Sequence, residues 1–224
     1  MCEPASFIVT RHDVLYSRVS DHHDIILAEH DIRDDSLNPA FVRVEVTPPR
    51  MDFLLPFDEW EFRTDQDLLP DWYSRGEAEA ACRRQLPAWA EHHLKVVGQG
   101  VFGDGLTKDL IAYDGNLGLR WTRIRRLPDG LTVEGDLDLG YTKIEKLPND
   151  LTVGRNLNIY YTKIDEFPEN LKVGGDLNAW GVSIKRYLGP SLVRGRVHTH
   201  DSILWEHLQN SIESYMAELG SKNV

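Results

Sequence analysis

Histidine and aspartate stand next to each other three times near the start of this 224-residue chain. Imidazole nitrogens and carboxylate oxygens are ligands for divalent metals, so such a cluster would suit a metal-dependent hydrolase. Neighbouring residues point in different directions in any regular element, and we therefore favour solvated or hydrogen-bonded side chains. We expect no metal and no cofactor. The three pairs are His12-Asp13, His23-Asp24 and His30-Asp31.

Aromatic and amide side chains recur at fixed spacing in the second half of the chain. Exposed Trp and Tyr beside polar groups are typical of protein-binding hot spots. Two structural alternatives stay open, because Tyr and Trp also favour strands and because ladders of Asn and Asp can be structural. The candidate binding residues are Trp121, Asp136, Asp138, Tyr141, Asn158, Tyr160, Tyr161, Asn178 and Trp180.

These side chains recur at a constant period, which equals the step from Leu117 to Leu137. Self-similarity at such a period indicates a stacked repeat, in which each unit buries its apolar face only against its neighbours. Each unit contains Leu-x-Leu, the alternation of a short strand, and a proline in the segment that returns to the next strand. Glycines before the strands suggest a turn or close packing. The columns include Leu117, Leu137, Leu157, Leu177 and Val197, and Ile124, Ile144, Ile164, Ile184 and Leu204.

The pattern Leu-x-Leu-x-x-Thr-x-Ile-x-x-Leu-Pro resembles the short, 20-residue bacterial leucine-rich repeats over about residues 111–204. Thr142 and Thr162 stand where that family has Asn, and Val133, Val153 and Val173 take the inward role of a Leu. The resemblance implies a solenoid with a parallel sheet, and a coil like a parallel β-helix is the second choice. The repeat is also similar to repeats in uncharacterised phage and prophage proteins, which implies a mobile-element origin.

The fold class we expect is α+β: a small N-terminal α+β domain (1–98), a β-solenoid of about five repeats (99–201), and a C-terminal capping helix (202–224). In the first domain, residues 6–10 and 41–46 have the composition of strands, and residues 25–30 and 77–94 that of helices. Pro87 should kink or split the second helix. Residues 96–105, with four glycines, are expected to join the domains.

The charge is unevenly distributed, since residues 1–98 carry nine of the eleven net negative charges. Nonspecific binding to nucleic acid needs clustered Lys and Arg, so we expect no direct nucleic-acid binding. An acidic protein can instead meet a basic surface, including one that normally holds nucleic acid. With no long apolar run, no signal peptide pattern and two cysteines, we expect a cytoplasmic protein and no membrane partner. The sequence does not indicate an oligomeric state.

Three functions remain in competition. The favoured one is a non-enzymatic protein-binding module, which the phage-like resemblance would make an inhibitor of a host defence complex. The second is a metal-dependent hydrolase with the His-Asp-rich domain as its active site. The third is an acidic nucleic-acid mimic that uses Asp34, Asp35, Asp65 and Asp67.

Overall fold

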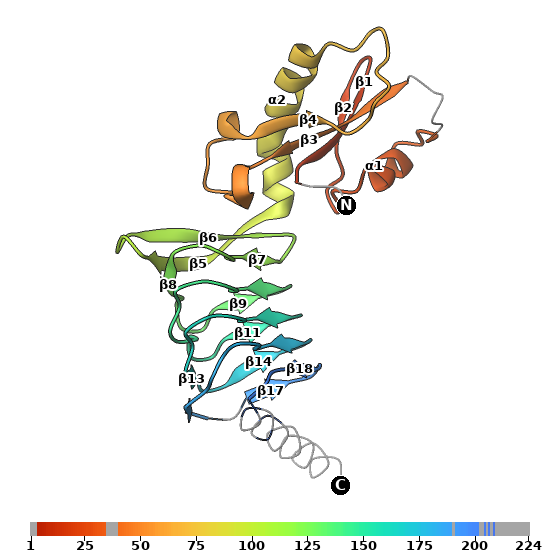
Figure 1. The fold of residues 1–224 in the computed structure, drawn as a ribbon. Helices are drawn as coiled ribbons and strands as arrows, with labels where there is room; N and C mark the ends of the chain where they lie inside the picture. Colours follow the sequence, from red (N-terminus) through yellow and green to blue (C-terminus); the bar gives the residue numbers. More distant parts are fainter. Residues whose placement is uncertain are drawn as a thin grey trace. The chain divides into compact units, whose positions relative to one another are not determined.

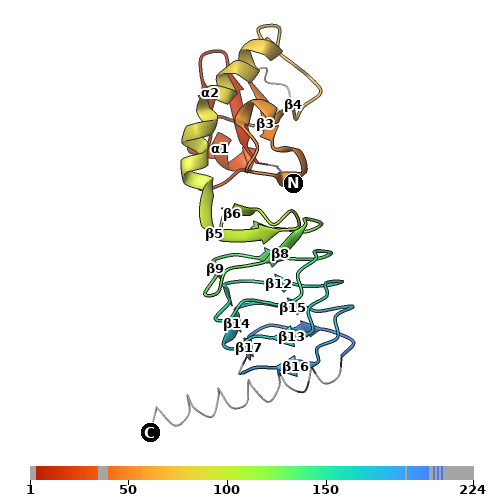
Figure 2. The same ribbon diagram turned by 90° about the vertical axis from the view of Figure 1, so that its left-hand side faces the viewer.

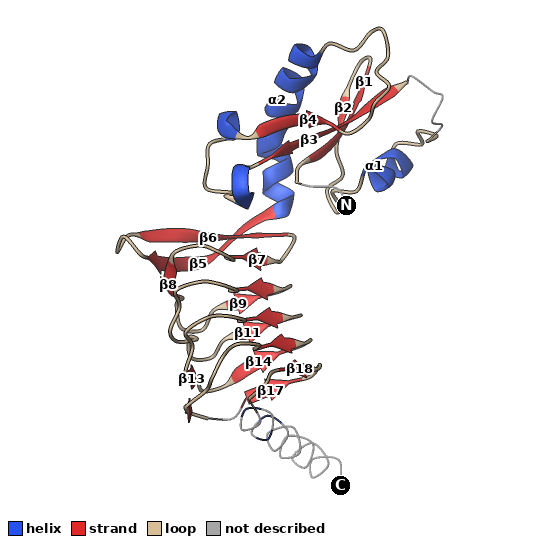
Figure 3. Ribbon diagram, viewed as in Figure 1, coloured by secondary structure: helices blue, strands red, loops and turns tan. Residues whose placement is uncertain are grey.

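The computed structural model describes residues 4–34, 40–189 and 191–201, together with residues 204, 206 and 208. The chain forms two compact units that meet between Leu94 and Lys95, and each unit is described by itself. Figure 1 shows helices concentrated in the first unit and short stacked strands in the second, and Figure 3 marks the same division by secondary structure.

The first unit is built on a four-stranded antiparallel sheet in the order β2-β1-β3-β4. The two strands predicted from the sequence are its centre, and the flanking strands were not predicted. Val and Phe dominate the central strands, whose regular alternation puts successive side chains on opposite faces. The strands are β1 (Ser6–Thr10), β2 (Val14–Leu15), β3 (Phe41–Thr47) and β4 (Glu61–Thr64).

Two helices cover opposite faces of this sheet (Figure 2). The first, α1 (His23–Glu29), buries Ile26 and Leu27 in a cluster with Ile8 and Phe41. The second, α2 (Arg75–His93), runs through Pro87 without a break, so Pro87 does not split this helix, and a kink there stays a prediction. It buries Ala78, Cys82, Leu86, Trp89 and His93. Two short 3-10 turns, η1 (Pro49–Met51) and η2 (Phe57–Glu59), lead from β3 to β4.

The second unit begins with a hairpin where the sequence suggested a junction. Strand β5 (Leu94–Phe102) lies between β6 (Thr107–Tyr113) and β8 (Ile124–Arg126) in a three-stranded sheet. Leu110 of β6 is buried in the same apolar cluster as the repeats. The hairpin therefore covers the first coil of the solenoid, a role that exposed ends of repeat proteins require.

The repeats form parallel ladders, and every register step between neighbouring strands equals one repeat, as from Leu117 to Leu137. From Leu117 to Val197 the main ladder completes four turns. A second ladder and a short third one lie on other sides of the coil. The main ladder is β7 (Leu117–Gly118), β10 (Leu137–Asp138), β12 (Leu157–Asn158), β15 (Leu177–Asn178) and β18 (Val197–His198). The others are β9 (Thr132–Val133), β11 (Thr152–Val153), β14 (Leu171–Val173) and β17 (Ser191–Val193), and β13 (Glu166–Phe167) with β16 (Arg186–Tyr187).

A single apolar core runs along the inside of the coils. The Leu and Ile columns are buried except for the partly buried Val197, and Val133, Val153 and Val173 point inward as the sequence indicated. Adjacent coils approach so closely at Gly154 and Gly174 that a Cβ there would collide with the backbone carbonyl of the preceding coil. The repeat therefore depends on glycine at these positions for its spacing.

The structure confirms a parallel β-solenoid that follows a strand-rich N-terminal region. Of the predicted C-terminal helix, only residues 204, 206 and 208 are described; all three are helical, and Leu204 and Leu208 are buried in the solenoid core. The rest of the predicted cap, within 202–224, lies outside the described residues. Among the described helices, none has both the length and the apolar content that crossing a membrane requires.

Candidate functional site

Five of the nine predicted binding residues form one surface, which we call the aromatic stripe: Trp121, Tyr141, Tyr160, Tyr161 and Trp180. They lie just after the strands of the main ladder, on successive coils. Trp121, Tyr161 and Trp180 are 66%, 52% and 52% exposed, values that large apolar side chains seldom reach together on one surface. The stripe is therefore a continuous aromatic surface, since the constant repeat length brings the same corner of each coil into line.

A tight turn positions these rings. In the first three coils the backbone N–H of a Thr donates to the carbonyl oxygen three residues earlier, as Thr142 N–H does to Leu139 at 3.2 Å, and in the fourth coil Val182 N–H does the same. The Thr hydroxyl donates to the same oxygen at 2.8 Å. The third residue of the turn has a positive φ, as in a type II turn, where glycine or asparagine is the usual choice. In successive coils this position is occupied by Trp121 (φ 63°), then Tyr141 (φ 58°), then Tyr161 (φ 51°) and finally Gly181 (φ 76°).

The left-handed conformation is unfavourable for these residues. It costs an ordinary L-residue about 1–2 kcal/mol, and for a bulky side chain a positive φ is a marked exception. The sequence nevertheless repeats an aromatic residue here three times, and only Gly181 is the residue that the turn prefers. Strain of this kind persists where surrounding contacts or function maintain it.

Stacking between the aromatic rings is one contact that maintains this strained backbone. The rings of Trp121 and Tyr141 are parallel within 9°, with centroids 3.8 Å apart, and the rings of Tyr141 and Tyr161 are parallel within 2° at 5.3 Å. Tyr160 meets Tyr141 edge-on at 4.7 Å. Offset and edge-on ring pairs are each worth about 0.5–1.5 kcal/mol beyond the area they bury, so the stack offsets part of the backbone cost.

Arg120 adds a positive charge to the stripe. Its guanidinium carbon lies 5.8 Å, 5.6 Å and 5.1 Å from the ring centroids of Trp121, Tyr141 and Tyr160, within the range of cation–π attraction. The pKa of the Tyr160 hydroxyl is raised above its ordinary value, chiefly because neighbouring groups displace water, although Arg120 acts in the opposite direction. The hydroxyl therefore stays protonated at neutral pH and can donate a hydrogen bond.

Two glycines leave room for the rings. A Cβ at Gly140 would collide with the ring of Tyr160, and a Cβ at Gly181 would lie 2.9 Å from the ring of Tyr161. Each ring therefore lies over the glycine of a neighbouring coil. These glycines occupy stripe positions in the repeat pattern, where the sequence alone shows them only as gaps in the aromatic columns.

The four polar residues predicted to bind accept hydrogen bonds from the backbone of the solenoid. The Asp136 carboxylate accepts the N–H of Asn156 at 2.8 Å, and Asp138 accepts the N–H of Gly140 at 2.9 Å and the Asn158 amide at 3.0 Å. Asn158 and Asn178 accept the N–H groups of Tyr160 and Trp180 at 3.3 Å and 3.2 Å. Their side chains hold adjacent coils together and fix the stripe's turns, which is the structural role that the sequence left open.

The same bond repeats along the first polar column. Each side-chain oxygen accepts the backbone N–H one coil later, at 2.7–2.8 Å, from Asn116 to Asp136, Asn156, Asp176 and Arg196 in turn. A Cβ at Gly135, Gly175 or Gly195 would meet these oxygens, so glycine there reflects close packing. None of these three glycines has a positive φ.

The His-Asp pairs of the first unit do not assemble into one site. His23 is buried, whereas Asp24, His30 and Asp31 are exposed. The neighbours of His23 are Glu45 and Asp65, whose oxygens, with a ring nitrogen of His23, lie within 4.8 Å of one another. Nothing in the sequence marks Glu45 for a metal site, because only the sheet register and α1 bring it to His23.

Two acceptors flank the His23 ring. The Nε2 atom is 3.1 Å from the carbonyl oxygen of Val44, and since a carbonyl can only accept, Nε2 donates the hydrogen bond. The Nδ1 atom lies 3.5 Å from an Asp65 oxygen. Arg63 pairs with the buried Glu45 at 2.5 Å and supplies part of the counter-charge.

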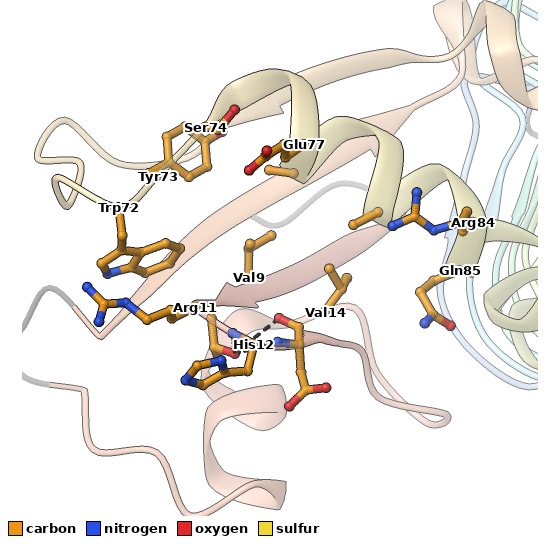
Figure 4. A pocket seen from close by; sticks show the side chains of 14 residues that line it. Val9, Arg11, His12, Val14, Trp72, Tyr73, Ser74, Glu77, Arg84 and Gln85 are labelled. Atoms are coloured by element: carbon orange, nitrogen blue, oxygen red, sulfur yellow. Dashed lines mark hydrogen bonds between the residues drawn. The ribbon is translucent and has the colours of Figure 1, made fainter.

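A cleft of about 490 Å³ lies elsewhere on the first unit, between the β1–β2 turn and the start of α2 (Figure 4). Its apolar lining is formed by Val9, Val14, Ala78 and Ala81. Its polar lining is formed by Thr10, Arg11, His12, Asp13, Trp72, Tyr73, Ser74, Glu77, Arg84 and Gln85. Of the three His-Asp pairs in the sequence, only His12-Asp13 lies here.

No known protein family, no curated protein and no solved structure matches the chain.

Proposed function

We propose that this protein is a non-enzymatic binding module whose recognition surface is the aromatic stripe. The observation that carries the proposal is the series of aromatic residues at the left-handed corner, Trp121, Tyr141 and Tyr161. A structural role alone would be met by glycine or asparagine at lower cost. Exposed rings held on a rigid scaffold are instead what a protein-binding hot spot requires.

The stack also favours a protein over a sugar or a nucleobase. Planar ligands bind by stacking on the open face of an aromatic ring. Both faces of Tyr141 are covered by its neighbours, and Tyr161 lies between Tyr141 and Gly181. At Tyr141 and Tyr161 the stripe thus presents ring edges, beside the Tyr160 hydroxyl, and these suit the mixed apolar and polar contacts of a protein interface.

A basic partner fits the charge of the chain. The first part of the chain, residues 1–98, carries most of the net charge of −11, and such an excess steers oppositely charged proteins toward the molecule. The resemblances to short leucine-rich repeats and to phage repeats support a finer proposal, in which a cytoplasmic host complex is the target and a C-terminal helix caps the solenoid. A nucleic-acid-binding surface on that target would meet the same charge requirement.

Affinity capture from host lysate tests the proposal when stripe and control variants are compared. The variant Tyr160→Ala/Trp180→Ala removes two rings, and Thr132→Ala/Lys172→Ala changes outward positions on the second ladder. We expect a stoichiometric partner with the wild type and the control, and its loss with the stripe variant. Equal capture by both variants, with both folded by circular dichroism, would show that the stripe is not the interface.

The metal-dependent alternative has one observation in its favour, the group formed by His23, Glu45 and Asp65. Its test is zinc titration of the full chain with Asp65→Asn, and with Asp67→Asn as a control that removes the same charge two residues away. Stoichiometric zinc lost only in Asp65→Asn would support a metal centre. Absence of zinc binding by the wild type would leave these residues as an ion-pair network.

A further inference from the structure

We propose that the cleft of the first unit binds a nucleotide-sized anion that carries a planar ring. This site is separate from the aromatic stripe and does not depend on the proposed function. At about 490 Å³ its volume falls within the range of small-molecule sites, roughly 300–1,000 Å³. The cleft combines an apolar floor with charged walls from two different elements, which is the arrangement that orients a polar ligand.

Two arginines supply the anion-binding groups. Arg11 extends from the end of β1 and Arg84 from α2, and Figure 4 shows them on opposite sides of the cleft. Within the described residues, neither guanidinium has a hydrogen bond or an ion pair. Arg83, next to Arg84, is by contrast occupied by Glu79 and by the carbonyl oxygen of Trp60. Guanidinium groups match phosphate and carboxylate oxygens, so unpaired ones beside a cleft favour an anionic ligand.

The start of α2 adds to the same electrostatic field. Ser74 is the N-cap residue of α2 and lines the cleft, and its side chain makes no capping hydrogen bond. The first backbone N–H groups of a helix need acceptors from outside it, and the helix dipole favours a negative charge at this end. The carboxylate of Glu77 in the first turn already meets part of this preference, and an anion in the cleft would rely on Arg11 and Arg84 to offset that carboxylate.

Other side chains narrow the chemical class. Trp72 lies beside Arg11 in Figure 4 and offers an indole for stacking at that end of the cleft. Glu77 and Asp13 provide carboxylates that accept hydrogen bonds from hydroxyl groups. A nucleotide combines all three features: a phosphate that the arginines bind, hydroxyls that the carboxylates accept from, and a planar ring that stacks on Trp72. A simple anion would contact the arginines alone, whereas a nucleotide would also contact the carboxylates and the indole of Trp72, which packs edge-on with Tyr73.

Calorimetric titration of the full chain with AMP, adenosine and inorganic phosphate tests this inference. The variants are Arg11→Ala and Arg84→Ala, and the matched control is Arg33→Ala, an exposed arginine of the same unit outside the cleft. We expect one AMP per chain, binding at least tenfold weaker in each cleft variant and unchanged in the control. Adenosine and phosphate alone should each bind at least tenfold more weakly than AMP.

Three outcomes would overturn the inference. These are no AMP binding by the wild type, AMP binding that Arg33→Ala weakens as much as Arg11→Ala, and phosphate binding as tight as AMP binding. Because Arg11 and Arg84 are surface side chains without internal partners, their variants should fold, and circular dichroism provides the check. A Trp72→Leu variant separates ring stacking from anion binding, since it should weaken AMP while leaving any phosphate affinity unchanged.

Discussion

Each full coil turns twice through a left-handed backbone, and the two corners carry opposite kinds of residue. At the corner before the second ladder, these positions are Gly130, Asp150 and Asn170, the types that tolerate a positive φ. At the other corner they are Trp121, Tyr141 and Tyr161. The backbone requirement is the same at both corners. The fold alone would accept Gly, Asp or Asn at both corners. The aromatic residues at the second corner therefore indicate a role beyond the backbone conformation.

The largest expected effect comes from disturbing the coil spacing that both corners share. In Gly174→Ala the added methyl would collide with the carbonyl oxygen of Gly154, and we expect a loss of about 3 kcal/mol in the free energy of unfolding. Urea unfolding measures it. Gly118→Ala is the control, since a Cβ there has nothing within 4 Å. Similar losses in both variants would mean that the spacing of the coils is not what glycine protects.

Exchanging residue types between the corners gives the next largest effect. We expect Asn170→Tyr to cost about 1–2 kcal/mol, because a bulky residue would take a positive φ. The substitution also removes the hydrogen bond from the Asn170 amide to Asp150. Asn170→Gly loses the same hydrogen bond but accepts the positive φ, so it should be about 1–2 kcal/mol more stable than Asn170→Tyr. If thermal unfolding shows no difference between the two variants, the conformational argument for the aromatic corner is wrong.

Substitutions in the polar columns test whether the partner contacts the aromatic stripe itself or the polar side chains beside it. Asp136→Ala removes the acceptor for the Asn156 N–H, and we expect a loss of about 1 kcal/mol in the free energy of unfolding. Asp136→Asn keeps an oxygen acceptor and should retain most of that stability. Partner capture should be the same with both variants. Capture that fails with Asp136→Asn, despite normal stability, would assign Asp136 to the interface.

The smallest expected change in stability is at the stripe itself. Tyr141→Gly relieves about 1–2 kcal/mol of backbone cost but removes ring contacts of similar total worth, so the net change should stay within about 1 kcal/mol. Partner affinity should nevertheless fall by more than about tenfold, as for a hot-spot residue. Tyr141→Phe keeps the ring stack and serves as the control. Unaltered affinity in Tyr141→Gly would leave the aromatic corner without a binding role.

The first unit shows how little of a site short motifs can determine. His23 was selected because it precedes an aspartate, yet Asp24 is exposed and the contacts of His23 are with Val44 and Asp65. These partners come from β3 and from the segment after β4, both distant from His23 along the chain. The cleft has the same origin, since Arg11 and Arg84 line one cleft only because α2 packs against the sheet. Spacing along the chain carried no signal for either grouping.

In the solenoid the sequence by itself determined the strand register, the inward residues and the columns of aromatic and polar side chains. It could do so because each coil packs on the next at a constant step of one repeat, which makes contacts between coils local in sequence. Only the tertiary structure decided which outward side chains hold the coils together and which are most exposed. Asp136 and Asn158 accept backbone hydrogen bonds between and within coils, whereas Trp121 and Tyr161 at the left-handed corner are more than half exposed. That distinction depends on the direction of each side chain at a turn, which residue type and period do not fix.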